Sequence, residues 1–304
     1  MTTPSRFART VYACAGLWLL AAPVDTSATA QNLQYLSGQA IVPAFEGWAR
    51  NPDGSFTFYF GYLNRNYREE LSIPLGPDNR IEPSHLTQTQ PTYFYPRRHR
   101  FLFSVQVPAN WGERDVTWTL TANGSTTTAY GSRLPVWEVN EQTISENRAG
   151  SGFAVGNQPP SIELVGANER AVRVGDTLSL TVRISDDGIP ETRPVGGPKD
   201  PRVVVDASGR PLFGAGRFGR RNALGLRAAW LQWRGPGKVT FDPWYMEGID
   251  DHMPGWAPPP LAPNGEVVTT ASFSAPGTYV LRAMADDGYF STPLDVTVTV
   301  TDHP

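Results

Sequence analysis

The chain has 304 residues, with 26 basic and 29 acidic side chains and a formal net charge of −3 at pH 7. A nucleic-acid-binding protein usually carries a strongly basic face, so we expect no nucleic-acid partner. The single cysteine, Cys14, excludes an intramolecular disulfide framework and a metal site built from several thiolates.

Residues 1–30 have the features of a secretory signal peptide. Arg6 and Arg9 form a short basic start, residues 11–22 are apolar, and residues 28–30 (ATA) offer the small side chains of a cleavage site. The apolar run is shorter than the roughly 20 residues of a membrane-spanning helix. We therefore expect a protein that is secreted, periplasmic or on the cell surface, with no transmembrane segment after cleavage. An uncleaved N-terminal anchor is the alternative.

The rest of the chain shows the pattern of an all-β protein. Short runs of β-branched and aromatic residues alternate with turn signals rich in glycine and proline, and helical periodicity is lacking. This pattern predicts two β-sandwich domains joined by a linker. The predicted boundaries are a first sandwich over residues 34–141, a linker over 142–160 and a second sandwich over 161–304.

In the first domain, the pattern predicts strands at residues 55–63, 70–75, 100–107 and 115–122. The dipeptide Asn123-Gly124 lies between two alternating runs and predicts a type I′ hairpin turn. Alternation along residues 55–63 (SFTFYFGYL) places Phe56, Phe58 and Phe60 on one face of the strand and Tyr59 on the other.

The second domain resembles the immunoglobulin-like modules of bacterial surface proteins, in particular the polycystic-kidney-disease (PKD) group. Two stretches carry the resemblance: residues 174–182 (VGDTLSLTV), and residues 275–301, which contain APGTYVLRA, Asp-Asp-Gly and a closing strand. The resemblance implies an immunoglobulin-like sandwich. Two long insertions, 189–226 and 243–265, depart from the family pattern, so no ligand follows from it.

If the strands of the second domain alternate in direction, both insertions and both Asp-Asp-Gly turns lie at the same end. Long connections in a compact domain tend to be functional or disordered. Carboxylates gathered at one place repel one another unless a cation intervenes, and Ca²⁺ takes oxygen ligands from such loops. The alternative is that Asp-Gly pairs only form turns. The candidate Ca²⁺ ligands are Asp186, Asp187, Asp250, Asp251, Asp286 and Asp287.

Three aromatic residues in the second insertion, Trp244, Tyr245 and Trp256, are candidate ligand-binding residues. Exposed rings of this kind bind sugars or partner side chains. The alternative is that they form a small satellite core that holds the insertion on the sandwich. Trp230 and Trp233, on a neighbouring predicted strand, differ in parity and should face opposite sides of it.

The sequence contains no nucleophile elbow, zinc-protease motif, phosphate loop or dinucleotide fingerprint. We therefore assign no catalytic residue and expect a non-catalytic binding or adhesion protein of the cell envelope, with a glycan or another envelope protein as partner. The alternatives are a structural accessory subunit of a larger exported assembly, whose aromatic strand faces a partner, and a secreted hydrolase that uses the acidic loops.

Overall fold

The computed structural model describes residues 35–149, 156–192, 224–243 and 260–302. Nearly all regular structure in these segments is β, as the sequence predicts. The strands of the first half are β1 (Ile41–Arg50), β2 (Phe56–Asn64), β3 (Leu71–Ser72), β4 (Asn79–Glu82), β5 (Tyr93–Phe94), β6 (Arg97–Val107), β7 (Val116–Ala122) and β8 (Ser125–Gly131).

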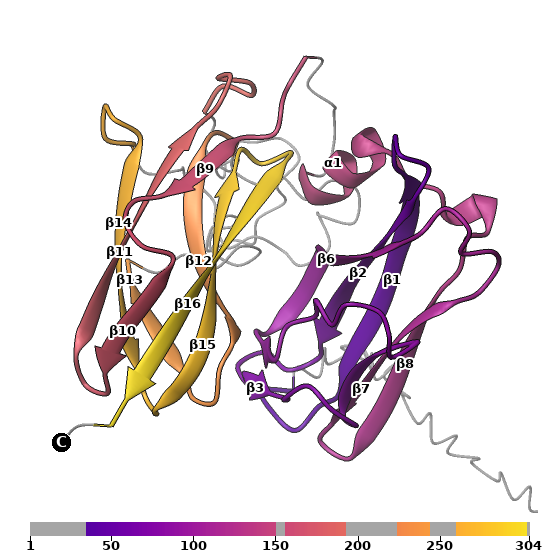
Figure 1. The fold of residues 1–304 in the computed structure, drawn as a ribbon, viewed down its shortest axis with the longest axis horizontal. Helices are drawn as coiled ribbons and strands as arrows, with labels where there is room; N and C mark the ends of the chain where they lie inside the picture. The colour runs from indigo at the N-terminus through magenta and orange to yellow at the C-terminus, as the bar shows by residue number, and fades with distance from the viewer. Residues whose placement is uncertain (1–34, 150–155, 193–223, 244–259, 303–304) are drawn as a thin grey trace, which may run out of the picture. The chain divides into compact units, whose positions relative to one another are not determined.

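The first sandwich packs the sheet β1-β2-β6 against the sheet β4-β7-β8, and β3 and β5 form a separate pair (Figure 1). The predicted hairpin joins β7 to β8, and Asn123 and Gly124 both have the positive φ angles, 49° and 73°, that a type I′ turn requires. The core between the two sheets is strongly aromatic; its largest fully buried side chains include Tyr62, Phe58, Phe60, Phe94, Trp111 and Trp118.

The predicted alternation along β2 is confirmed, but its phenylalanine face lies inside the first sandwich, where no partner contacts it. Phe56, Phe58 and Phe60 all lie in the core of the first sandwich, and none is more than 3 % exposed. On the opposite face, Tyr59 is half-buried and pairs edge-on with the ring of Phe101. The phenylalanine stripe therefore stabilises the first sandwich and does not face a partner.

A short 3₁₀ helix, η1 (Pro135–Trp137), and an α-helix, α1 (Glu141–Ala149), follow β8. Helix α1 lies within the segment predicted as a linker. Its N-terminus is capped by Asn140, whose Oδ1 accepts hydrogen bonds from the backbone N–H and the hydroxyl of Thr143, at 2.8 and 2.9 Å. Within the described part of the chain, no helix has the length and apolar character needed to cross a membrane.

The second sandwich has two four-stranded sheets in the strand order of an immunoglobulin-like domain. One sheet has the order β13-β14-β11-β9 and the other the order β10-β16-β15-β12, and only β10 and β16 pair in parallel. The bounds are β9 (Ser161–Leu164), β10 (Glu169–Arg173), β11 (Thr177–Ser185), β12 (Arg227–Arg234), β13 (Val239–Asp242), β14 (Glu266–Phe273), β15 (Gly277–Asp286) and β16 (Ser291–Thr301).

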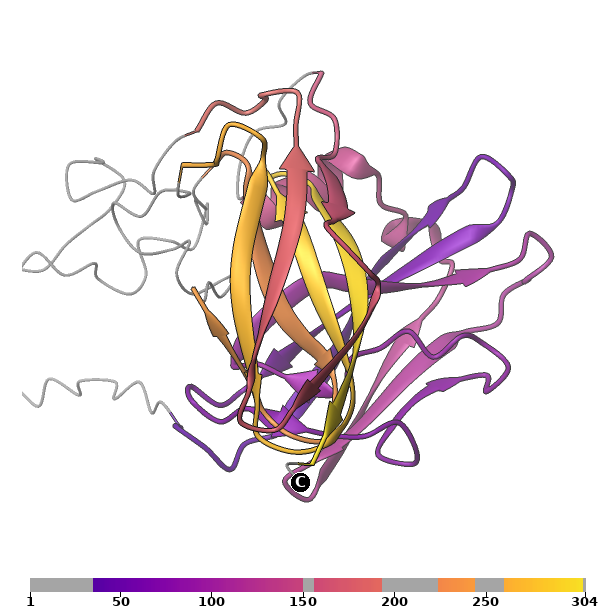
Figure 2. The same ribbon diagram turned by 60° about the vertical axis from the view of Figure 1, so that its left-hand side comes forward.

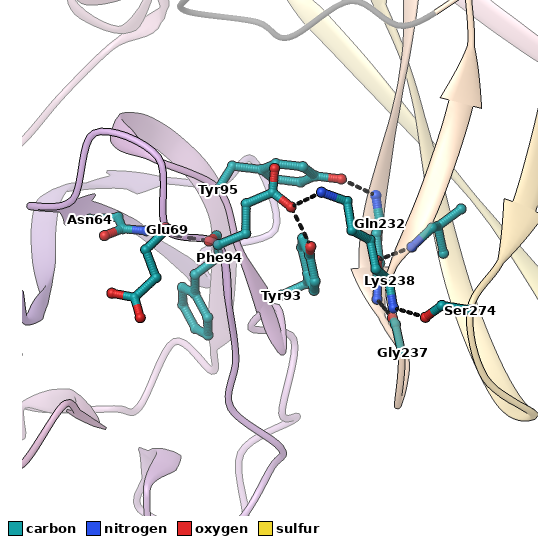
Figure 3. Close-up of polar contacts among 11 residues, drawn as sticks. Asn64, Glu69, Tyr93, Phe94, Tyr95, Gln232, Gly237, Lys238 and Ser274 are labelled. Carbon is teal, nitrogen blue, oxygen red and sulfur yellow. Dashed lines mark hydrogen bonds and ion pairs between the residues drawn. The ribbon is translucent and has the colours of Figure 1, made fainter. Parts of the chain in front are cut away.

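Direct polar contacts join the first sandwich to the second, and both belong to one compact unit, residues 34–304. The phenol oxygen of Tyr95 accepts a hydrogen bond from the backbone N–H of Gln232 at 2.9 Å. Glu70 Oε2 accepts one hydrogen bond from Tyr93 at 2.5 Å and another from Lys238 at 2.7 Å. Figure 3 shows this group of contacts, which connects β5 to the turn between β12 and β13.

Apolar packing accompanies these hydrogen bonds. Tyr93 and Tyr95 form a buried cluster with Leu231 of β12 and Met284 of β15. Trp233 packs into the core of the first sandwich, and its carbonyl accepts a hydrogen bond from the N–H of Thr92 at 2.9 Å. The two sandwiches thus bury surface against each other. The domain boundaries at residues 141 and 161 remain predictions from the sequence.

The two tryptophans of β12 face opposite sides, as their parity predicts. Trp230 packs in the core of the second sandwich, whereas Trp233 packs in that of the first. Arg282 of β15 covers the outer surface of Trp233, with its guanidinium carbon 3.5 Å from the ring centroid. The second face of β12 is therefore covered by the other sandwich.

Candidate functional site

The loops of the second sandwich gather at one end, as strand alternation predicts. Residues 186–192 follow β11, residues 260–265 precede β14, and residues 287–290 join β15 to β16. In Figure 1 the β15–β16 connection lies at the upper end of the sandwich and the C-terminal end of β16 at the lower end. Figure 2 shows the loops that follow β11 and precede β14 at the same upper end. We call this the loop-bearing end.

Both Asp-Asp-Gly sequences form turns closed by their own carboxylates. Asp187 Oδ1 accepts a hydrogen bond from the N–H of Ile189 at 2.7 Å. Asp286 Oδ1 accepts one from the N–H of Gly288 at 2.8 Å, and the φ of Gly288 is 99°. Asp287 Oδ1 accepts two, from the N–H groups of residues 289 and 290, at 2.6 and 2.7 Å. These bonds show that turn formation accounts for part of the aspartate pattern.

The segment before β9 connects the two turns to each other. Asn157 donates a hydrogen bond from Nδ2 to Asp287 Oδ2 at 3.0 Å, and the N–H of Gln158 donates to Asp187 Oδ2 at 2.9 Å. The Asp187 and Asp287 carboxylates therefore flank one short piece of chain. Strand alternation predicts that these loops lie at the same end. The hydrogen bonds further show that the carboxylates of Asp187 and Asp287 both contact residues 157–158.

Asp286 has a different environment from its neighbours. It forms a buried ion pair with Arg227 at the start of β12, with 2.6 Å between Nη2 and Oδ1. The side chains of Asp286 and Arg227 are only 5 % and 8 % exposed. This carboxylate therefore already has a cationic partner, and the role predicted for Asp286 in cation binding stays a prediction.

Asp186 has the most strongly perturbed carboxyl group of this end. Burial is the main cause that raises its pKa, to about 6, and the negative charges of Asp287 and Asp187 raise it further. Burial also raises the pKa of Asp287, although the hydrogen bonds that it accepts act in the opposite direction. Burial, more than charge repulsion, is therefore what raises the pKa of both carboxyl groups.

Among the residues that the structure describes, three buried oxygen atoms at this end have no hydrogen-bond partner: Asp186 Oδ1, Asn157 Oδ1 and Ser291 Oγ. Asn157 is only 5 % exposed, and its amide already bonds to Asp287. Carboxylate, amide and hydroxyl oxygens are the ligands that Ca²⁺ prefers. The donor chemistry thus fits Ca²⁺, although the described residues contain no group of three or more His, Cys, Asp or Glu side chains arranged to hold a metal.

The other predicted site residues lie outside the described residues. These are the aspartates Asp250 and Asp251 and the aromatic residues Trp244, Tyr245 and Trp256. The roles predicted for them in cation and ligand binding stay predictions.

Three residues of this end, Asn157, Arg227 and Ser291, were not predicted from the sequence. Each of them lies just before or at the start of a strand that leaves the loop-bearing end, namely β9, β12 and β16. The strand alternation that predicts both aspartate turns at one end of the sandwich also predicts that each strand running away from that end begins there. The signal was therefore present in the predicted topology.

No protein-family model matches the chain, and no curated protein matches it either. Among solved structures, a conjugative transposon lipoprotein from Bacteroides eggerthii aligns with 46 % of this chain and 96 % of its own, at 12 % identity and a TM-score of 0.25. Titin domains Z1Z2 in complex with telethonin align over 86 % and 98 %, at 10 % identity and a TM-score of 0.23.

The Yersinia pseudotuberculosis adhesin InvE aligns over 87 % of this chain and 60 % of its own, at 11 % identity and a TM-score of 0.23. Scores this low carry no conclusion about function. The functional conclusion therefore rests on the geometry of this chain.

Proposed function

We propose that this protein is an exported, non-catalytic binding protein of the cell envelope, and that Ca²⁺ orders the loop-bearing end of its second sandwich for that role. The carboxylate of Asp186 carries the proposal. It is part-buried near the negative charges of Asp187 and Asp287, and its pKa is raised to about 6. Its Oδ1 has no hydrogen-bond partner within the described segments. A divalent cation offsets such charge and supplies the missing partner.

The cation would be held by Asp186 Oδ1 and Asn157 Oδ1, which have no hydrogen-bond partner among the described residues. The Asp287 carboxylate, which accepts three hydrogen bonds, would add its negative charge beside them. Asp286 stays with Arg227, and Asp187 keeps its hydrogen bonds to the backbone N–H groups of residues 158 and 189. Ca²⁺ would neutralise the cluster and fix the segment before β9 against both aspartate turns. This would give the long loops a rigid base, the usual arrangement when loops on a sandwich bind a ligand.

The partner would be a glycan or another envelope protein. Support comes from the predicted signal peptide and from loops that emerge together at one end of a rigid sandwich. The accessory-subunit alternative would have to use the Tyr59 face of β2, because the phenylalanine face lies in the core. The hydrolase alternative lacks an assigned catalytic residue.

The proposal can be tested by co-sedimentation of residues 31–304 with purified peptidoglycan sacculi and with insoluble polysaccharides, in Ca²⁺ and in a chelator. We expect sedimentation that needs Ca²⁺ and that Asp186→Asn abolishes. The matched control is Glu169→Gln, an exposed acidic side chain on β10, which should sediment like the wild type. Release of soluble sugar during the assay would contradict a non-catalytic role, and sedimentation unchanged by chelator would contradict the Ca²⁺ requirement.

A further inference from the structure

The first sandwich presents a protruding apolar turn that its own core does not use. Leu134, Val136 and Trp137 are 57 %, 83 % and 44 % exposed, and Pro135 between them is exposed as well. No residue of the 3₁₀ helix within this turn is buried. We call residues 134–137 the apolar tip. Four consecutive exposed apolar residues in one turn mark an interaction surface more strongly than single exposed hydrophobic residues do.

The apolar tip is held firmly against β1. The indole N–H of Trp48 donates a hydrogen bond to the carbonyl of Leu134 at 3.0 Å, and the N–H of Val139 donates to the carbonyl of Trp48 at 2.9 Å. The ring of Trp137 packs against Phe45, with 5.6 Å between centroids. The tip is therefore preorganised, and little conformational freedom is lost when a partner covers it.

Two arginines, Arg133 next to the tip in sequence and Arg50 of β1, place their guanidinium groups over the ring of Phe56. The guanidinium carbon of Arg133 is 4.0 Å from the centroid of Phe56, and that of Arg50 is 5.1 Å from the same centroid. Among the residues that the structure describes, neither arginine has an ion-pair partner, and Arg133 Nε lacks a hydrogen-bond acceptor. Guanidinium groups are suited to recognising phosphate oxygens.

We infer that the apolar tip and its two arginines, Arg50 and Arg133, dock on a phospholipid surface, with the tip in the headgroup region and the arginines on lipid phosphates. Tryptophan favours this interfacial layer, and apolar side chains enter it to a depth of about 5–10 Å. The site is separate from the loop-bearing end and independent of Ca²⁺.

Two features favour a lipid surface over a protein partner. A specific protein interface usually buries more than about 1,000 Å², which a tip of four residues does not supply, whereas insertion into a bilayer has no such threshold. Part of the tip's backbone is also already hydrogen-bonded within the protein, which lowers the cost of placing it in a poorly hydrated layer. The carbonyl of Leu134 accepts hydrogen bonds from Trp48 and Trp137, that of Pro135 accepts one from Glu138, and proline has no N–H to satisfy.

The test is sedimentation of residues 31–304 with vesicles of phosphatidylglycerol and phosphatidylethanolamine, at low salt and in chelator. Both hydrophobic cores lie within this part of the chain, so the apolar run at residues 11–22 can be left out. We expect weak, measurable binding that Val136→Asp reduces about tenfold, the effect of losing one inserted aliphatic side chain. Val268→Asp is the matched control, since Val268 is a 53 % exposed valine on the second sandwich and should bind like the wild type.

The arginines are tested with Arg50→Gln combined with Arg133→Gln. This double variant should lose the preference for vesicles containing phosphatidylglycerol over vesicles of phosphatidylcholine alone, whereas Arg173→Gln, an exposed arginine on β10, should keep it. The inference is overturned if the wild type does not bind vesicles at low salt, or if Val136→Asp binds as well as Val268→Asp. It is also overturned if Val136→Asp instead converts a dimer into a monomer, because the tip would then contact a second copy of the chain.

Discussion

The raised pKa of Asp186 gives the sharpest prediction, because it links charge to stability at one atom. In the folded protein this pKa is about 6, against an ordinary value of 3.8. The folded state therefore binds the proton more tightly than the unfolded state does. The resulting stabilisation is complete below about pH 4 and is lost as the pH rises through about 6. Without a cation, ionised Asp186 should destabilise the protein at neutral pH.

A shift of roughly two pKa units corresponds to about 3 kcal/mol. Because Asp186 is only part-buried, solvent screening reduces the expected effect to about 1–1.5 kcal/mol. Asp186→Asn removes the charge, so at pH 7.5 in chelator it should raise the melting temperature by about 2–5 °C. The difference between variant and wild type should fall toward zero at pH 4.

The assay is a set of thermal melts of residues 31–304 in chelator, from pH 4 to pH 8, with Glu169→Gln as the control for a lost surface charge. We expect the control to follow the wild type across the range. A variant Asp186→Asn that melts at the same temperature as the wild type at pH 7.5, or below it, would refute the reasoning, because the carboxylate would then not be under electrostatic strain.

Three further predictions concern the buried contacts of the second sandwich. Arg227→Met removes one partner of a buried ion pair and should cost about 3–5 kcal/mol in urea unfolding at pH 7. Tyr95→Phe removes the acceptor of a buried backbone N–H and should cost about 1–3 kcal/mol, whereas Tyr130→Phe, at a 65 % exposed site, should be neutral. Trp233→Ala should cost about 3–5 kcal/mol and split a single calorimetric transition into two, because this ring joins the two cores; a single transition in the variant would argue against that role.

Elements with strong local signals were predicted well from the sequence. The turn at Asn123-Gly124 needs two positive φ angles, which the residue types themselves supply. The strands of the second sandwich, from β11 to β16, follow regular alternation between clear turns. Strand β1 was missed, because Pro43 and a bulge between Phe45 and Gly47 interrupt its alternation.

The other features that were not predicted from the sequence depend either on tertiary contacts or on local signals that were overlooked. Sequence parity predicts that Trp230 and Trp233 face opposite sides of β12, but not which of them leaves its own core or that the first sandwich covers it. Helix α1 has few apolar residues, yet the cap at Asn140 was a readable start signal. Asp286 could not be separated from Asp186 by sequence, because both occur in the same tripeptide and only the position of Arg227 distinguishes them.

The measurement that tests the central claim most directly is calorimetric titration of Ca²⁺ into residues 31–304, with Mg²⁺ for comparison. The proposed site predicts one bound Ca²⁺ per chain, release of protons at pH 6 from the Asp186 carboxyl, and loss of binding in Asp186→Asn but not in Glu169→Gln. No heat of binding in the wild type, or equal binding by wild type and Asp186→Asn, would contradict a cation site at the loop-bearing end.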